Sequence, residues 1–550
     1  MSRILKTIAL SLLAALPLAA SALDRTELLP PSAQTYVRIS DTTTFWNKLK
    51  VSSIGKLWQD QQFQDFLGNP DNETWQELFF DGEMDAEDEV MLEQLKMLSG
   101  EVILAFDLKS EEPYIIAAMS QEDFIRSLDL DEKLKDSSEQ PFEIIKSSFQ
   151  DVEIIQHIEN GGTPEEEKSW QANIGNTLIL GYTREWIEQS IVRLKKETPK
   201  EPEGNPEFNI NVPVSSLIKT SMEDDGAAAS QLALFEALGI FDITTFSSTI
   251  VLKDDRLEAD NRLVISDLAR GLFTLLDLQP SELPTVTFIP ENIASLEVGR
   301  FNLLRFWQEI PSLLSSASPE MKPQFDMILG MIQQQAGINL EQDLLSNLGT
   351  KYIAFATVED NNQISVVAVD LKDGAAFKKS FETALAAPAM QSYVAMGLES
   401  LDFLDHTLYT IKNNDPETPI AFTITADYLL YGHPNGLRQT LRSITSEAAE
   451  NQAFERTELV KGLRQNITPR AFSYNAVDWK KNMDAIIKEF NRPEYTSIIL
   501  QKWATSGSAL PPPDFSKLPS SNHIAEFFNV SYQYIEANSS GLHQKIILKY

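Results

Sequence analysis

The chain carries one sequence pattern twice, about 250 residues apart. Each occurrence has a proline, then a short strand-like run, then a helix with an adjacent Phe and Trp. The three parts are Leu29-Pro30, Tyr36–Ile39 and Phe45-Trp46 in the first occurrence, and Ile289-Pro290, Ser295–Val298 and Phe306-Trp307 in the second. A repeated pattern predicts two similar domains or half-domains, so it constrains the fold more than any other feature of the chain.

Further strand and helix signals follow each occurrence in the same order. Asp41 and Ser120 precede amphipathic runs and are predicted helix N-caps. Apolar alternation between turn-rich stretches predicts strands. The predicted strands are 102–108, 114–119, 142–146, 152–158 and 171–182 in the first copy, and 352–358, 364–371, 407–412 and 420–430 in the second. Each copy then ends in a long strand pair, 245–252 with 257–265 and 526–536 with 542–548.

This order predicts an α+β protein of two related units. Hairpins outnumber parallel crossovers, which favours mixed or mainly antiparallel sheets with helices packed on one face. The predicted units are residues 23–284 and 285–550, with the boundary in the proline-bearing stretch at 280–284.

The first 22 residues have the pattern of a secretory signal peptide. Arg3 and Lys6 precede an apolar stretch at 8–19, and Ala20-Ser21-Ala22 is a small-x-small cleavage site. The stretch is too short to span a bilayer, and no later apolar run has spanning length. We therefore expect export to the periplasm, with release outside the cell as the alternative, and no transmembrane segment after cleavage.

Composition narrows the classes of partner. The chain has no Cys, so an exported protein of this sequence relies on core burial rather than on disulfides. Its formal net charge is −34. Nucleic acids and anionic membrane surfaces require basic patches, so we expect neither as a partner. The charge favours solubility, and a cation or basic protein is the more specific alternative.

Several motifs of the chain occur together in a known group of proteins. They are Leu29-Pro30 with Tyr36–Ile39 and Asp41, the helix with Gly55-Lys56-Leu57-Trp58, and Gly337–Leu345 leading into Leu348-Gly349. In these motifs the chain resembles a broad family of exported Gram-negative bacterial proteins catalogued as a domain of unknown function. The resemblance covers most of the chain and implies a periplasmic or surface-exported protein, without an assigned activity.

Two clusters suggest metal ions, and each has a simpler interpretation. Asp402, Asp405 and His406 could supply metal ligands, but a turn with solvated carboxylates explains them better. The acidic stretch 81–89 resembles a calcium loop, yet Ala86 stands where such a loop needs Gly. A solvated helix start is the favoured interpretation of that stretch. The predicted metal-ligand set is therefore empty.

No catalytic or cofactor-binding residue is predicted either. Among the other histidines, His157 is about 13 Å from Glu153 by strand geometry, His433 lies in a turn, and His523 and His543 have no acidic neighbour at ligand spacing. Nucleophile-elbow, Ser-x-x-Lys and phosphate-binding glycine motifs are absent. We therefore predict that the protein is not an enzyme.

Three functional hypotheses remain open. The first is a non-enzymatic binding or scaffold protein of the cell envelope, with an unknown envelope protein as partner. The second is a carrier of a hydrophobic ligand, lipid or peptide, held between helices and sheet. Aromatic residues at helical spacing, such as Trp46, Trp58 and Phe63, favour core packing but also suit such a groove. The third is a carboxylate- or metal-dependent hydrolase.

Overall fold

The computed structural model describes most of the chain outside its first residues. The described residues are 23–68, 93–94, 97–98, 100–108, 110, 112–137, 142–159, 168–200, 207–224, 229–283, 286, 288–318, 320–391, 397–411, 419–445, 457–505 and 512–550. The predicted signal peptide and the acidic stretch 81–89 lie outside them.

The chain divides into two compact units, which are described separately. Unit 1 comprises Met1–Asn47 and Phe80–Asn211, and unit 2 comprises Lys48–Phe79 and Val212–Tyr550. This division falls within the first predicted repeat, and the predicted boundary near 284 lies inside unit 2. A repeat and a compact unit need not coincide, so the predicted repeat boundary stays a prediction.

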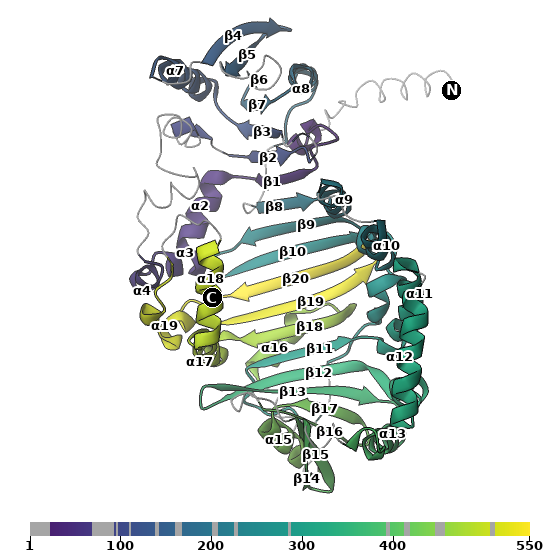
Figure 1. Ribbon diagram of the computed structural model, residues 1–550. Helices are drawn as coiled ribbons and strands as arrows, with labels where there is room; N and C mark the ends of the chain where they lie inside the picture. The colour runs from purple at the N-terminus through teal and green to yellow at the C-terminus, as the bar shows by residue number, and fades with distance from the viewer. Residues whose placement is uncertain are drawn as a thin grey trace, which may run out of the picture. The chain divides into compact units, whose positions relative to one another are not determined.

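Unit 1 is an antiparallel sheet with a helix on each face (Figure 1). Its strand order is β8-β1-β2-β3-β7-β6-β5-β4. Its elements are η1 (Arg25–Leu28), β1 (Thr35–Ile39), β2 (Val102–Phe106), β3 (Pro113–Ala118), α7 (Gln121–Ser137), β4 (Phe142–Phe149), β5 (Val152–Glu159), β6 (Lys168–Ile174), β7 (Thr177–Gly181), α8 (Arg184–Lys196) and β8 (Glu207–Val212), and α2 (Thr42–Val51) continues into unit 2.

Both faces of the unit 1 sheet have a hydrophobic core. On one face, Trp186 and Ile187 of α8 pack with Ile116. On the other, Phe124 and Leu128 of α7 lie in a second buried cluster. Because successive strand residues point to opposite faces, one apolar strand such as β3 contributes to both cores.

A buried ion cluster lies at the edge of the first core. Glu101 is 1% exposed, and its carboxylate accepts from Arg25 at 2.6 Å and from Arg38 at 2.5 Å. Two guanidinium groups offset the cost of removing one carboxylate from water. The cluster fixes the N-terminal segment of unit 1 against the start of β2.

Unit 2 contains a larger antiparallel sheet. Its strand order is β9-β10-β20-β19-β18-β11-β12-β13-β17-β16-β15-β14. Its strands are β9 (Ile243–Leu252), β10 (Arg256–Ile265), β11 (Ser295–Arg300), β12 (Leu348–Glu359), β13 (Asn362–Leu371), β14 (Leu398–Phe403), β15 (His406–Ile411), β16 (Ile420–Ile424), β17 (Tyr428–Gly432), β18 (Ala471–Asp478), β19 (Val530–Asn538) and β20 (Gly541–Lys549).

Helices pack at both ends of these strands and on parts of both faces (Figure 1). They are α3 (Ser53–Trp58), α4 (Gln61–Phe66), α9 (Val214–Asp224), α10 (Ala229–Ala237), η2 (Ile240–Asp242), η3 (Gly271–Leu275), α11 (Leu303–Ala317), α12 (Met321–Ala336), η4 (Leu340–Leu344), η5 (Leu345–Asn347), α13 (Gly374–Ala386), α15 (Pro434–Thr445), α16 (Glu458–Asn466), α17 (Trp479–Phe490), α18 (Pro493–Thr505), η7 (Phe515–Lys517) and α19 (Ser521–Ala525).

The main core of unit 2 lies on one face of its sheet. Leu437 and Leu441 of α15 and Leu463 of α16 pack there against fully buried strand residues such as Leu296 and Ala476. On the opposite face, α13 packs through Phe377 and Phe381 against residues of β12, β13, β15, β16 and β17. The α+β class with antiparallel sheets is thereby confirmed.

The two sheets share one order of strands. The series β8-β1-β2-β3-β7-β6-β5-β4 of unit 1 matches β18-β11-β12-β13-β17-β16-β15-β14 of unit 2, strand for strand. The two C-terminal hairpins, β9–β10 and β19–β20, meet in unit 2 through antiparallel pairing of β10 with β20.

Local signals agree with the structure in most places. Asp41 accepts from the backbone of Thr44 and Ser120 accepts from that of Asp123, so both predicted caps are confirmed. The predicted single strands 171–182 and 420–430 are wrong, because each is a hairpin, β6–β7 and β16–β17.

Candidate functional site

The most unusual surface of unit 2 is one face of β9, β10 and β20. Directly paired residues of neighbouring strands point to the same face of a sheet. On this face the pairing forms three apolar rows across the strands. The rows are Leu252–Leu257–Leu548, Ile250–Ala259–Ile546 and Phe246–Leu263–Leu542. Among the described residues, no helix packs closely on β10 or β20.

The other face of the same strands is charged. Arg256, Glu258, Asp260 and Arg262 alternate with the apolar residues of β10. Glu258 pairs with Lys545 of β20 at 3.1 Å, and Asp260 pairs with His543 at 2.9 Å. An antiparallel sheet that faces water on one side normally packs its apolar side on a core. On β10 and β20 the apolar side has no such closely packed helix among the described residues.

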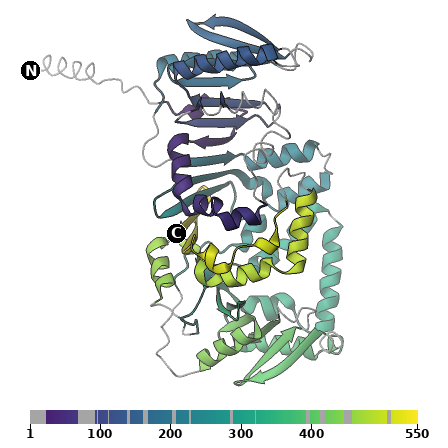
Figure 2. The same cartoon turned by 90° about the vertical axis from the view of Figure 1, so that its left-hand side faces the viewer.

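Helices stand along both edges of this apolar face and form the walls of a trough. The two walls are α12 and α18, which lie on the same side of the sheet in Figure 2. Helix α16 lies on the opposite side. The walls expose apolar side chains themselves: Met327 is 60% and Ile332 is 51% exposed on α12, and Ile498 is 50% exposed on α18. We use "trough" for this surface of unit 2, with its floor on β9, β10, β20, β19, β18, β11 and β12.

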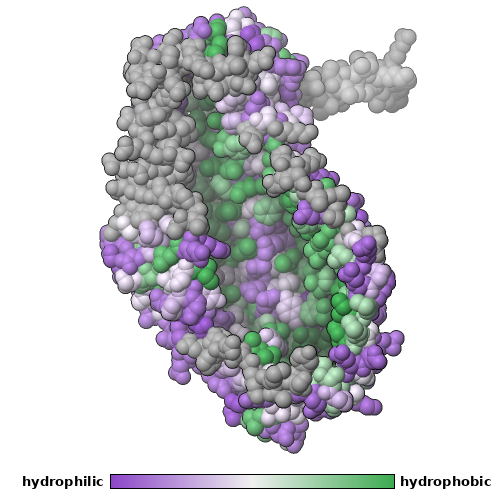
Figure 3. All heavy atoms as spheres, in the orientation of Figure 1, coloured by the Kyte–Doolittle hydropathy of each residue, from purple (hydrophilic) through white to green (hydrophobic). Residues whose placement is uncertain are grey.

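Figure 3 shows the trough from its open side. Hydrophobic residues, in green, line the floor and one wall, and a hydrophilic band, in purple, lies between them. The strand register identifies polar residues on this face. They are Ser248, Asn261 and Gln544 on β9, β10 and β20, and Gln533, Asn475 and Glu297 on β19, β18 and β11. Asn261 donates to the side-chain oxygen of Gln544 at 2.9 Å, so the band is hydrogen-bonded within itself.

A cavity of about 460 Å³ lies over the polar band where β11, β18 and β19 meet. Glu297, Asn475 and Gln533 line it, together with apolar side chains such as Ile535 and Leu542. Ligand pockets commonly have volumes of roughly 300–1,000 Å³ and combine apolar walls with a few polar groups. The cavity therefore has the size and composition of a small-ligand site.

Tyr352 holds Glu297 in place at this cavity. Its hydroxyl donates to a carboxylate oxygen of Glu297 at 2.5 Å. Burial and this hydrogen bond raise the pKa of Tyr352, so the hydroxyl keeps its proton. The ring lies across Gly299, where an added Cβ would be 2.6 Å from ring atoms. Glycine in β11 thus creates the space that brings Tyr352 to Glu297.

Arg300, the cationic side chain at this cavity, already has an anionic partner. Arg300 binds Asp277 at 2.6 Å and the hydroxyl of Thr350 at 3.0 Å. Burial opposes ionisation of Asp277, but hydrogen bonds from Thr350 and Arg300 outweigh it and lower the pKa of Asp277. Asp277 therefore stays ionised and neutralises Arg300. No salt bridge to Glu297 occurs among the described residues.

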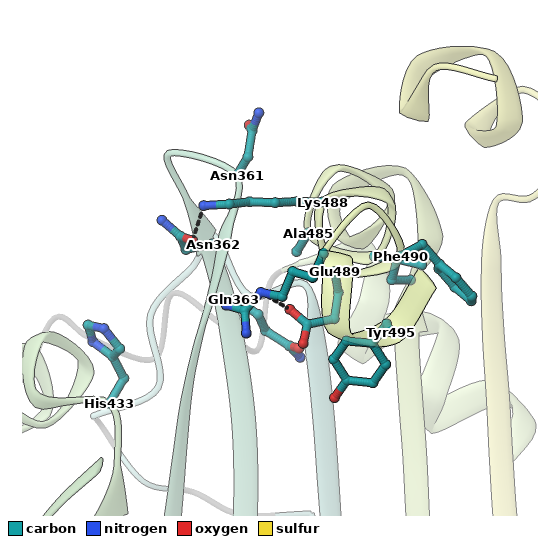
Figure 4. Close-up of a pocket in the computed structure, with 11 residues that line it drawn as sticks. Asn361, Asn362, Gln363, His433, Ala485, Lys488, Glu489, Phe490 and Tyr495 are labelled. Atoms are coloured by element: carbon teal, nitrogen blue, oxygen red, sulfur yellow. Dashed lines mark hydrogen bonds and ion pairs between the residues drawn. The ribbon is translucent and has the colours of Figure 1, made fainter. Parts of the chain in front are cut away.

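A second cavity of about 480 Å³ lies at the corner between α17 and α18 (Figure 4). The β12–β13 turn contributes Asn361 and Asn362 to it, and Lys488 donates to the Asn362 side chain at 2.6 Å. Tyr495, 48% exposed, supplies an aromatic ring. His433 lies at the far side of the cavity, and burial lowers its pKa. Among the charged groups that line the cavity, Arg492 is paired with Glu489 at 3.0 Å.

The sequence candidates for a metal site lie in a hairpin turn. Leu404 and Asp405 have positive φ angles of 50° and 62° and form the two-residue turn between β14 and β15. Asp402 accepts from the hydroxyl of Thr407 at 3.3 Å, next to His406. No group of three potential metal-binding side chains occurs among the described residues. The positive φ angles of Leu404 and Asp405 agree with the turn that the sequence predicts there.

Tertiary contacts give three of the other histidines partners. His157 is 2.9 Å from the side chain of Gln171. His523 is 2.8 Å from Asp60. His543 is 2.9 Å from Asp260 and 3.2 Å from Glu536, on three adjacent strands. Sequence spacing could not reveal Asp60 and Asp260, because they are hundreds of residues from the histidines that they contact. Glu536 is seven residues from His543 and reaches it across the β19–β20 hairpin.

Sequence reasoning also missed the residues of the trough. The sequence of β10 has apolar residues at alternate positions from Leu257 to Leu263, interrupted by Asn261, and charged residues between them. This alternation signalled one polar and one apolar face. It could not signal that β20 would extend the apolar face or that no helix would cover it.

Comparison with known proteins adds no function. No protein-family model matches the chain, and no curated protein matches it. Among solved structures, crystal form I of TP0453 matches 45% of this chain and 81% of its own, at 9% identity and a TM-score of 0.23. Crystal form III of TP0453 matches 44% of this chain and 81% of its own, at 7% identity and the same TM-score. Similarity this low supports no argument about this protein.

Proposed function

We propose that the protein is an exported, non-enzymatic carrier of a lipid-like amphiphile, whose acyl chain lies on the floor of the trough. The observation that supports this is the apolar face of β10 and β20, on which no helix packs closely among the described residues, although Leu252 and Ala259 of the same apolar rows are already buried. Apolar surface of this kind is stabilised when a ligand removes it from water. The exposed apolar side chains of α12 and α18 extend the same surface along the walls.

The dimensions suit an extended chain. Neighbouring strands are roughly 4.8 Å apart, so the seven strands of the floor span roughly 29 Å. The hydrocarbon half of a bilayer is only about 15 Å thick. One long chain, or two shorter chains end to end, therefore has room along the floor.

An acyl chain fits the floor better than an extended peptide does. The backbone groups of the floor strands already pair with each other, so a peptide on this face would find no sheet edge for its own N–H and C=O groups. Unpaired backbone groups on an apolar surface cost free energy, and an alkyl chain has none. An amphipathic helix satisfies its own backbone and is the alternative that the experiments below distinguish.

Binding of an uncharged monoacylglycerol to two variants of β10 tests the proposal. Leu263→Asn places an amide on the floor, whereas Val264→Asn places one on the opposite face, one residue away. Burying a Leu side chain is worth about 1.5–3 kcal/mol, so Leu263→Asn is expected to weaken binding about tenfold. Val264→Asn leaves binding unchanged. Isothermal titration calorimetry below the critical micelle concentration measures both.

The same titrations can refute the carrier. If the wild-type protein binds no monoacylglycerol, or if both variants bind as tightly as the wild type, the floor does not hold an acyl chain. Circular dichroism of each variant shows whether the sheet is retained, so that a loss of fold is not mistaken for a loss of affinity.

Export and the periplasmic location are proposed from the sequence, and the internal duplication from the sequence and the strand order. The secretory pattern at residues 1–22 supports export, and the resemblance to exported Gram-negative proteins supports a periplasmic location. The matching strand order of the two sheets supports an internal duplication. No helix among the described residues is long and apolar enough to span a membrane.

A further inference from the structure

The cavity at Glu297 indicates which polar group the ligand carries. We propose that it receives an ammonium group at the polar end of the amphiphile, a specificity that rests on the carrier function proposed above. The cavity lies on the trough floor, so a chain on the floor can place its polar end there.

Charge is the first reason for this assignment. Two charged side chains line the cavity among the described residues, Glu297 and Arg300. Asp277 neutralises Arg300 at 2.6 Å, whereas no salt bridge reaches Glu297. A ligand in the cavity therefore meets an uncompensated carboxylate. An ammonium group is attracted to it, and a phosphate, sulfate or carboxylate is repelled.

Hydrogen-bonding capacity is the second reason. A carboxylate accepts up to about four hydrogen bonds, and Tyr352 supplies one of them to Glu297 at 2.5 Å. Asn475 and Gln533, also at the cavity, each offer a side-chain carbonyl oxygen as a further acceptor beside their NH2 donors. An ammonium group carries donors and no acceptor, which matches these acceptors.

The third reason is that Glu297 is held in position before any ligand arrives. The Tyr352 ring lies against Gly299, with no room for a Cβ between them, and is tilted by 39° against the Phe301 ring, with ring centroids 5.8 Å apart. A fixed carboxylate loses little side-chain freedom on binding, which favours affinity.

Three single-chain amphiphiles of equal chain length test the assignment: an alkylammonium, an uncharged monoacylglycerol and an alkyl sulfate. Each is titrated into the full-length protein below its critical micelle concentration, at about 0.15 M ionic strength to screen the acidic surface. The wild-type protein is expected to bind the alkylammonium about tenfold more tightly than the monoacylglycerol, and the alkyl sulfate more weakly than either.

Two variants and one control locate that preference. Glu297→Gln keeps an acceptor for Tyr352 but removes the charge, so the ammonium preference disappears while monoacylglycerol binding is retained. Tyr352→Phe removes the donor that holds Glu297 but leaves the charge, so the ammonium preference is reduced without being abolished. Glu291→Gln, the same change at an exposed glutamate six residues away, leaves all three affinities unchanged. Thermal unfolding reports whether each variant folds.

The outcomes separate the two proposals. If all three amphiphiles bind the wild-type protein equally, or if the preference persists in Glu297→Gln, the ammonium assignment is wrong and the carrier function stands. If no amphiphile binds the wild-type protein, the carrier function itself is wrong.

Discussion

Glu258 is the residue whose ionisation most directly joins the two terminal hairpins. It lies on the charged face of β10, where its carboxylate accepts from Lys253 at 2.6 Å and Arg256 at 2.7 Å and pairs with Lys545 of β20 at 3.1 Å. Burial alone would raise its pKa, but the hydrogen bonds from these three cations lower it to about 2. The ionised carboxylate therefore stabilises the pairing of β10 with β20.

The lowered pKa of Glu258 predicts a specific dependence of stability on pH. The folded pKa of about 2 is below the ordinary value of 4.5, so the stabilisation is full above pH 4.5 and is lost as the pH falls towards 2. Glu258→Gln should therefore lower the free energy of unfolding at pH 7 and make no difference near pH 2. Urea unfolding across this range measures it. A constant difference between wild type and variant at every pH would contradict the assignment.

At the scale of elements, the packing of β11 beside β12 depends on the close approach of the Tyr352 ring to Gly299. The Tyr352 ring occupies the space that a side chain at Gly299 would need, and an added Cβ would lie 2.6 Å from it. Gly299→Ala should displace the ring, break its bond to Glu297 and destabilise unit 2 by about 1–3 kcal/mol, as overpacking does. Urea unfolding measures the change.

A second glycine is a matched control for this substitution. Gly330 lies within α12, and an added Cβ there meets nothing within 4 Å. Because Ala favours a helix interior by about 1 kcal/mol over Gly, Gly330→Ala should stabilise the protein. If Gly299→Ala were neutral or stabilising like Gly330→Ala, Tyr352 would not be held as described.

Local signals predicted individual elements better than they predicted partners. The hairpin of 245–252 with 257–265 is confirmed as β9–β10, because alternation and the Asp254-Asp255 turn specify it locally. Its pairing with β20 joins residues such as Asn261 and Gln544, 283 positions apart. No local pattern specifies such a partner. The trough could not be predicted for the same reason, since it requires both hairpins.

The wrong strand assignments have a local cause. Residues 171–182 form a hairpin because Gly175, with φ 63°, and Asn176 make a turn between two apolar runs. A Gly-Asn pair between strand-like runs is a known hairpin signal. The apolar runs on both sides of this pair favour strands so strongly that the apolar pattern alone predicts one continuous strand.

For the molecule as a whole, the repeated sequence pattern and the repeated strand order agree. The two hairpins that close the predicted copies pair with each other inside unit 2, and this pairing creates a continuous apolar face. Neither hairpin alone has the width of that face. The proposed carrier function therefore depends on the pairing of β10 with β20 rather than on any single sequence motif.

Native mass spectrometry of the protein purified without detergent from its own cells tests this account most directly. The account predicts a discrete added mass in the lipid range, which yields fatty acyl fragments on dissociation. The double variant Leu263→Asn/Ile546→Asn, altered on two rows of the floor, should carry little of it. A bare chain mass for the wild-type protein, or an added mass that fragments as a polypeptide, would contradict it.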